Sequence, residues 1–391
     1  MSEAVVQPPV LRWAQRRGGH DDGAMRNRFG NWDQWLTREK TPHFSDIARI
    51  AHFTRVPLGY LFLPEPPQED LPIPDLRSGR GSAPAASDEL LDTIYLNQRR
   101  QAWYEDHLAE VGDLAEVGAA VPPLPFVGSA RNAGVEEAAS RILHALDYGI
   151  HSRRAMGSAE RARTHLIEAF EDLGGLVVVN SMVENNTHRP LDLGEFRGFT
   201  LHSATAPLVF VNGKDTKRGQ IFSLLHEFAH VWRGESAVSA GGDPMVARDH
   251  ATERWCDAVA AQIAVPSDDL RRNFDPDADL TAELDRLSIR YWCSTLVILI
   301  RLRETGHVPR EHFADIYADE VDRLLHLHAG TERAGGGSFY ANQAFRVGRT
   351  LSRELIADTL RGSTPMTEAL RLLSFKRTSV FDGYADHLGM V

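Results

Sequence analysis

The stretch FSLLHEFAHVWRG, Phe222 to Gly234, constrains the fold of this chain more than any other. Its residues are apolar on nearly all sides of a helix, and Gly234 stands where helices commonly end. Such a helix is expected to be buried, which places His226, Glu227 and His230 in the interior. Burying two imidazoles and a carboxylate is costly unless a metal ion or other polar partners satisfy them. The stretch therefore predicts a buried helix that carries a polar site.

The spacing within this stretch is typical of a zinc site. His226 and His230 are four residues apart, so on a helix both project from one face and can reach the same ion. Glu227 is displaced by about 100° from His226 and can reach a water beside the ion rather than the ion itself. The alternatives are core histidines bonded to the backbone and a glutamate in a salt bridge. A second motif is needed to decide between these interpretations.

A second motif follows in ATERWCDAVAAQIAVP, Ala251 to Pro266. Glu253 and Asp257 share one helical face, and several small residues would let this helix pack closely against the first. We expect Glu253 to be the third metal ligand and Asp257 to fix a ligating histidine by a hydrogen bond. The alternatives are an exposed helix carboxylate for Glu253 and a helix-dipole partner for Asp257. Cys256 points away from this face and is expected to be a packed thiol.

Composition and charge exclude several classes of protein. No window approaches 18 continuous apolar residues, and no apolar stretch follows a basic start, so we expect neither a membrane span nor a signal peptide. Two cysteines in 391 residues indicate a reducing compartment, so we expect a cytoplasmic protein. The net charge of −11 argues against a chain that coats nucleic acid. Residues 1–60 nevertheless carry nine Lys and Arg against six Asp and Glu, which leaves a local DNA contact open.

The pattern along the chain predicts an α+β fold that is mostly helical. The apolar runs LVVVNS, FRGFTLHS and APLVFVNG predict a small sheet, whereas the chain after HEFAH is expected to be helical apart from loops. We interpret Ala206–Gly213 either as an edge strand to which substrate adds or as an interior strand. The predicted domains are a helical segment (residues 1–63), a proline-rich linker (64–88), a metal-site domain (89–329) and, around Gly335–Gly337, a C-terminal helical module (330–391).

Two long stretches resemble the core of the ImmA/IrrE metallopeptidases: LVFVNGKDTKRGQIFSLLHEFAH and ERWCDAVAAQIAVPSDDL. The stretches TPHFSDIARIA and VPLGYLFLPEPP resemble the repressor-like (XRE-type) helix-turn-helix segment found in members of that family. GGHDDGAMRNRF departs from that pattern, so residues 1–63 are either a DNA reader or a degenerate segment with a structural or partner-binding role. The resemblance implies a zincin-like peptidase core in which His226, His230 and Glu253 hold zinc and Glu227 is the base.

Two hypotheses follow. In the first, the protein is a regulatory zinc-dependent endopeptidase that cleaves a specific intracellular partner. The family resemblance implies a partner such as a transcriptional repressor. His202 and His250 are then candidates for a further oxyanion donor. In the second, it is a non-catalytic regulator, either antitoxin-like or transcriptional, whose peptidase fold binds and neutralises a partner such as a toxin; a DNA contact through residues 1–63 stays open. Two histidines and one carboxylate also suit Mn²⁺, Fe²⁺ or Co²⁺.

Overall fold

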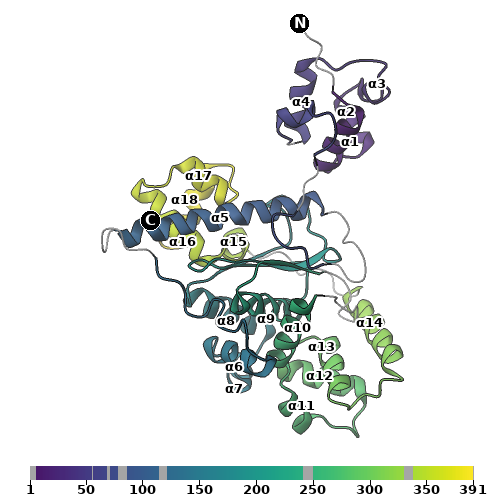
Figure 1. Ribbon diagram of the computed structural model, residues 1–391, viewed down its shortest axis with the longest axis vertical. Helices are drawn as coiled ribbons and strands as arrows, with labels where there is room; N and C mark the ends of the chain where they lie inside the picture. Colours follow the sequence, from purple (N-terminus) through teal and green to yellow (C-terminus); the bar gives the residue numbers. More distant parts are fainter. Residues whose placement is uncertain are drawn as a thin grey trace. The chain divides into compact units, whose positions relative to one another are not determined.

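The computed structural model describes residues 6–54, 56–67, 71–77, 86–113, 121–240, 250–329 and 338–390. The chain forms two compact units (Figure 1). The first comprises Met1–Leu71 with Ala86–Asp88, and the second comprises Pro72–Ala85 with Glu89–Val391. The predicted division into four domains stays a prediction, and the glycines at 335–337 lie outside the described residues.

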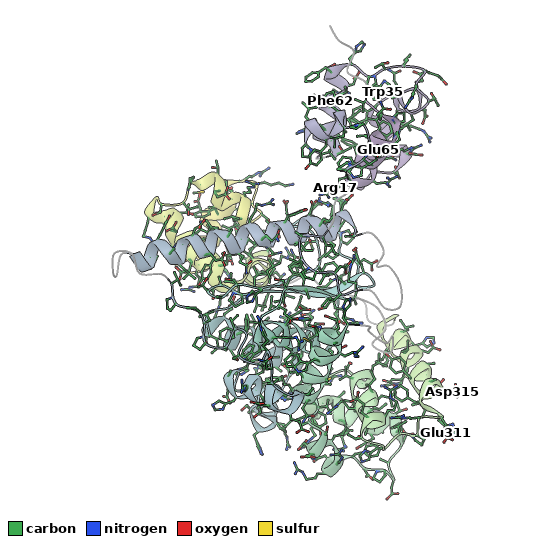
Figure 2. The ribbon with its side chains drawn as sticks, viewed as in Figure 1. Arg17, Trp35, Phe62, Glu65, Glu311 and Asp315 are labelled. Carbon is green, nitrogen blue, oxygen red and sulfur yellow. The ribbon has the colours of Figure 1, made fainter. Side chains whose placement is uncertain are left out.

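The first unit is a small helical bundle whose side chains are drawn in Figure 2. Its core contains Trp32, Trp35 and Ile50, and Asp21 caps α2 by accepting a hydrogen bond from the Ala24 amide at 2.7 Å. Helix α2 therefore forms inside the glycine-containing stretch that departs from the family pattern. The helix-turn-helix interpretation stays a prediction. The elements are α1 (Pro8–Arg17), α2 (Asp22–Arg28), α3 (Trp32–Leu36), α4 (Phe44–Thr54) and the 3₁₀ helix η1 (Leu58–Phe62).

The second unit is built on a four-stranded mixed sheet with strand order β1-β3-β2-β4. Strand β3 is parallel to β1 and antiparallel to β2, and β2 is antiparallel to β4. Every residue of β1 and β3 is buried, as their uniformly apolar runs predict for strands covered on both faces. The mostly helical α+β fold class is confirmed. The strands are β1 (Leu176–Asn180), β2 (Phe196–Leu201), β3 (Leu208–Asn212) and β4 (Ala237–Ala240).

Helices cover both faces of this sheet (Figure 1). On one face α8 and α9 pack through stacked rings of Phe170 and Phe228, whose centroids are 4.3 Å apart. This side contains α6 (Val135–Ala145), α7 (Ile150–Met156), α8 (Ala159–Asp172), α9 (Lys217–Arg233), α10 (Ala251–Ala264), α11 (Ser267–Asn273), α12 (Leu280–Tyr291), α13 (Thr295–Glu304) and α14 (Phe313–Ala329).

The other face carries a long helix and the C-terminal helices. The guanidinium of buried Arg100 donates to the Leu372 carbonyl at 2.9 Å, so α5 and α17 are joined inside this unit. These elements are α5 (Asp88–Asp113), α15 (Phe339–Val347), α16 (Arg349–Arg361), α17 (Met366–Leu372) and α18 (Thr378–His387).

The structure decides between the two interpretations of Ala206–Gly213 and contradicts one expectation about the sheet. Strand β3, formed by part of Ala206–Gly213, lies between β1 and β2, so it is interior and offers no edge to a substrate. Strand β4 follows α9 directly, where only helices and loops were expected. At the outer side of β4, the Val238 amide donates to the Pro74 carbonyl at 3.0 Å, and the Leu76 amide donates to the Val238 carbonyl at 3.2 Å. The chain itself therefore occupies part of this edge.

Candidate metal centre

Helix α9 forms as its sequence predicts. The Thr216 hydroxyl accepts from the Gly219 amide at 3.0 Å to cap the first turn. Gly234 ends the helix in the left-handed conformation (φ 79°), and its amide donates to the His230 carbonyl at 2.9 Å. His226 and Glu227 in the middle of the helix are buried, with 3% and 1% of their surface exposed. The polar residues of HEFAH thus lie inside the protein.

The structure brings His226, His230 and Glu253 together. The two Nε2 atoms lie 3.2 Å apart, and His230 Nε2 lies 2.9 Å from Glu253 Oε1. His226 Nε2 lies 3.5 Å from Glu253 Oε2. Ligands of a tetrahedral zinc ion are about 3.3 Å apart, because zinc–nitrogen distances are about 2.0–2.1 Å. The three side chains therefore match a single divalent ion in both chemistry and spacing, although their roles as ligands stay a prediction.

Asp257 lies behind the first histidine. Its Oδ1 atom is 2.9 Å from His226 Nδ1, while the opposite ring nitrogen faces Glu253 and His230. This contact places a proton on Nδ1 and leaves Nε2 free to act as a ligand. It is the geometry that the predicted role of Asp257 requires, rather than that of a helix-dipole partner.

The charges of His226, His230 and Glu253, together called the cluster, strongly affect the pKa values within it. Burial alone would lower the pKa of His226, but the charges of Glu253 and Asp257 outweigh it and raise the pKa to about 10. Burial would raise the pKa of Glu253, but the two imidazoles outweigh it and hold that pKa far below its ordinary value. The fold therefore concentrates negative charge that a proton on His226 balances, and a divalent cation would displace this proton.

Glu227 is held beneath strand β2. Its Oε2 atom accepts a hydrogen bond from the Thr200 hydroxyl at 2.8 Å. A Cβ atom at Gly198 would lie 2.7 Å from Glu227 Oε1, so this strand position needs glycine for the carboxylate to approach. Burial raises the pKa of Glu227, against the opposing charges of His226 and His230. A carboxylate with a raised pKa beside three candidate metal ligands is suited to general acid–base chemistry.

The sequence analysis missed Gly198 and Thr200. The glycine inside the apolar run FRGFTLHS was a signal, because glycine within a strand often marks a close approach. No signal marked Thr200, since threonine is common in strands.

Three other residues were considered in the sequence analysis: His202, His250 and Cys256. In the described part of the chain, neither His202 nor His250 makes a side-chain hydrogen bond or ion pair with the three candidate ligands. Their role as oxyanion donors stays a prediction, because such a donor would contact the substrate rather than the ligands. Cys256 is buried with a free thiol, and burial raises the pKa of that thiol well above its ordinary value. It is a packed side chain, as expected.

The comparisons with known families agree with this geometry. Residues 177–303 match the model of a peptidase family described as the IrrE N-terminal-like domain. The match begins in β1 and ends in α13, so it contains all of the sheet except Leu176, together with both helices of the cluster. It supports the resemblance to the ImmA/IrrE family. Residues 347–387 match a domain of unknown function, and no curated protein matches the chain.

Neither family match includes the N-terminal helical segment. Across the described residues, no helix is both long enough and apolar enough to cross a membrane.

Proposed function

We propose that this protein is a regulatory zinc-dependent endopeptidase that cleaves a specific intracellular partner such as a transcriptional repressor. One observation carries the proposal: two Nε2 atoms and one carboxylate converge at the spacing of a zinc site, beside the buried carboxylate of Glu227. The peptidase family match over residues 177–303 supports it. The partner and the cytoplasmic location rest on the family resemblance and on cysteine usage.

Each residue of the site has a defined task in this proposal. His226, His230 and Glu253 would hold the ion, which when bound lowers the pKa of a water molecule and polarises a peptide carbonyl. Asp257 accepts a hydrogen bond from the Nδ1–H group of His226 and so fixes the ring for binding. Glu227 takes a proton from the attacking water and returns it to the leaving amine. The Thr200 hydroxyl fixes the orientation of the Glu227 carboxylate.

A cleavage experiment tests this proposal. The zinc-loaded protein is incubated with peptides from a digested proteome, and new termini are identified by mass spectrometry. We expect wild type to cut a narrow set of peptides and Glu227→Gln to lose at least about 100-fold in rate with unchanged zinc content. Glu160→Gln, which changes a largely exposed carboxylate on α8, is the matched control and should cut normally.

Exposed aromatic rings favour the second candidate, a non-catalytic regulator that binds a partner such as a toxin. In the first unit, Phe44, Tyr60 and Phe62 are 62%, 41% and 37% exposed, and the rings of Phe44 and Phe62 stack at 6.2 Å. Exposed aromatic clusters commonly mark protein-binding surfaces. Bound zinc without cleavage of any peptide would favour this candidate over the peptidase.

A further inference from the structure

A cavity of about 920 Å³ is lined by residues of α9, α10, α13 and α14. This volume is within the range of pockets that bind small molecules or peptide side chains. Helices α13 and α14 form one wall, and none of the three candidate metal ligands lines the cavity. Asp257, which contacts His226, is on its lining and connects the cavity to the metal cluster.

The contacts between α9 and α10 show how close the cavity is to the cluster. His230 faces Glu253 and His226 faces Asp257, so the two helices run antiparallel. One further turn along each helix reaches Phe222 on α9 and Ala261 on α10, and both line the cavity. Four residues of helix span about 6 Å. The cavity therefore opens one helical turn from the proposed metal site.

Besides the polar side chains of Ser223, Arg254 and Asp257, the part of the cavity nearest the cluster has an apolar lining. Phe222 lies on one side, and Ala258 and Ala261 on α10 leave space because their side chains are small. The opposite wall is formed by side chains of α13, namely Leu296, Val297 and Ile300. Such a lining suits a branched or aromatic side chain, since burial of apolar surface is its main source of affinity.

The end of the cavity beside the first turn of α9 is positively charged. Six arginines and four carboxylates line the cavity as a whole. The half-buried Arg218 makes no hydrogen bond or ion pair with any described residue, and it stands in the first turn of α9, where the helix dipole adds positive charge. Arg197 also lines this part and donates to Asp215 at 2.6 Å. This end is suited to a carboxylate.

The distance between the apolar part and the positive part of the cavity gives the spacing of the two substrate residues that they would bind. Arg218 and His226 are eight residues apart on α9, which corresponds to about 12 Å along the helix. An extended peptide covers about 3.3–3.6 Å per residue. A carboxylate at Arg218 would therefore belong to a residue about three or four positions from the bond at the metal.

We propose that this cavity binds the substrate strand beside the scissile bond. It takes an apolar side chain next to that bond and an acidic residue three or four positions further along the strand. This inference rests on the proposed peptidase function and defines the substrate class of that same site.

Hydroxamate binding tests the apolar part without requiring cleavage. Two hydroxamates that differ in carrying an isobutyl or a methyl side chain are titrated calorimetrically into zinc-loaded protein. We expect the isobutyl compound to bind at least about tenfold more tightly to wild type, because it buries more apolar surface. Ala261→Trp fills the cavity and should bring the ratio close to one at unchanged zinc content. Ala282→Trp, on an exposed position of α12, is the control and should keep the wild-type ratio.

A second pair of compounds tests the positive part. Peptide hydroxamates carrying the isobutyl group and ending in glutamate or glutamine at the fourth position are compared at low salt. We expect glutamate to bind several-fold more tightly, and Arg218→Gln to remove this preference while keeping the preference for isobutyl. Should Ala261→Trp not fold, Ala258→Phe replaces it.

The measurements distinguish failure of this inference from failure of the proposed function. Equal affinity for isobutyl and methyl compounds in a zinc-loaded wild type would overturn this inference and leave the proposed function standing. A wild-type protein that takes up no zinc would overturn the proposed function and this inference together.

Discussion

Gly198 in β2 lies against the Glu227 carboxylate, and its replacement by alanine would disturb that carboxylate without contacting the three candidate ligands. The new Cβ atom would lie 2.7 Å from Glu227 Oε1 and 2.7 Å from the backbone carbonyl of Phe210. Ordinary contacts of a Cβ atom begin at 3.4 Å, so the carboxylate, the strand or both must move by several tenths of an ångström. The hydrogen bond of 2.8 Å from Thr200 to Glu227 would be broken or bent by such a shift.

We expect this change to reduce catalysis far more than it reduces metal binding. A displacement approaching 1 Å in a catalytic group can lower the rate by about 100-fold. Overpacking at a buried position lowers the free energy of unfolding by about 1–3 kcal/mol. We therefore predict that Gly198→Ala keeps its zinc, melts at a lower temperature and loses about 100-fold in kcat/KM.

The assay is cleavage of a peptide found in the proteome digest, together with zinc content and thermal unfolding. Gly30→Ala is the control, because a Cβ atom at that exposed position would meet nothing within 4 Å beyond its chain neighbours, and it should behave as wild type. A Gly198→Ala variant with wild-type kcat/KM would refute the assignment of Glu227 as the base. Loss of zinc in a folded Gly198→Ala variant would contradict the prediction that this change disturbs Glu227 without disturbing the three candidate ligands.

Three further predictions concern other contacts. Asp257→Asn should weaken zinc binding by about 10–100-fold, because it weakens the hydrogen bond to His226. Competition with a chromogenic chelator measures the zinc affinity, and an unchanged affinity would show that Asp257 has no role at the metal. Burial raises the pKa of Glu171 from 4.5 to about 7, so the folded state keeps a proton that the unfolded state has lost, and stability falls as pH rises between these values. Glu171→Gln should remove this loss, on the order of 2–3 kcal/mol, when urea unfolding at pH 5 is compared with pH 8; parallel pH dependence in both proteins would contradict the assignment. Arg77→Ala removes the guanidinium that now lies 2.8 Å from Asp75 and 2.9 Å from Glu195. The free energy of unfolding measured in urea should therefore fall by about 1–3 kcal/mol. An unchanged value would show that these two ion pairs add no stability at the edge of β4.

The residues of the candidate site could be predicted because they follow a local rule. A spacing of four residues brings His226 beside His230 and Glu253 beside Asp257 on their helices, whatever the rest of the chain does. The pairing of the two helices was then indicated by the chemistry of zinc, which needs a third ligand. Gly198 and Thr200 reach Glu227 from a different element, and no local pattern reveals such a contact.

The order of the strands could not be predicted for the same reason. Uniformly apolar runs indicate buried strands, but they are equally compatible with an edge and an interior position once helices cover both faces. Strand β4 consists of four residues, Ala237–Ala240, without the alternation that identifies longer strands. The contact of Pro74 and Leu76 with Val238 is made by backbone atoms, so the proline-rich sequence indicated only a connector.

The metal content of the protein tests the central claim most directly. Wild type, Glu227→Gln and Glu253→Ala are purified without added metal, checked for folding by circular dichroism and analysed by mass spectrometry for bound metals. The account predicts about one zinc ion per chain in wild type and in Glu227→Gln, and a large loss of zinc in folded Glu253→Ala. A folded wild type without metal that takes up none when zinc is added, or zinc retained in full by Glu253→Ala, would contradict it.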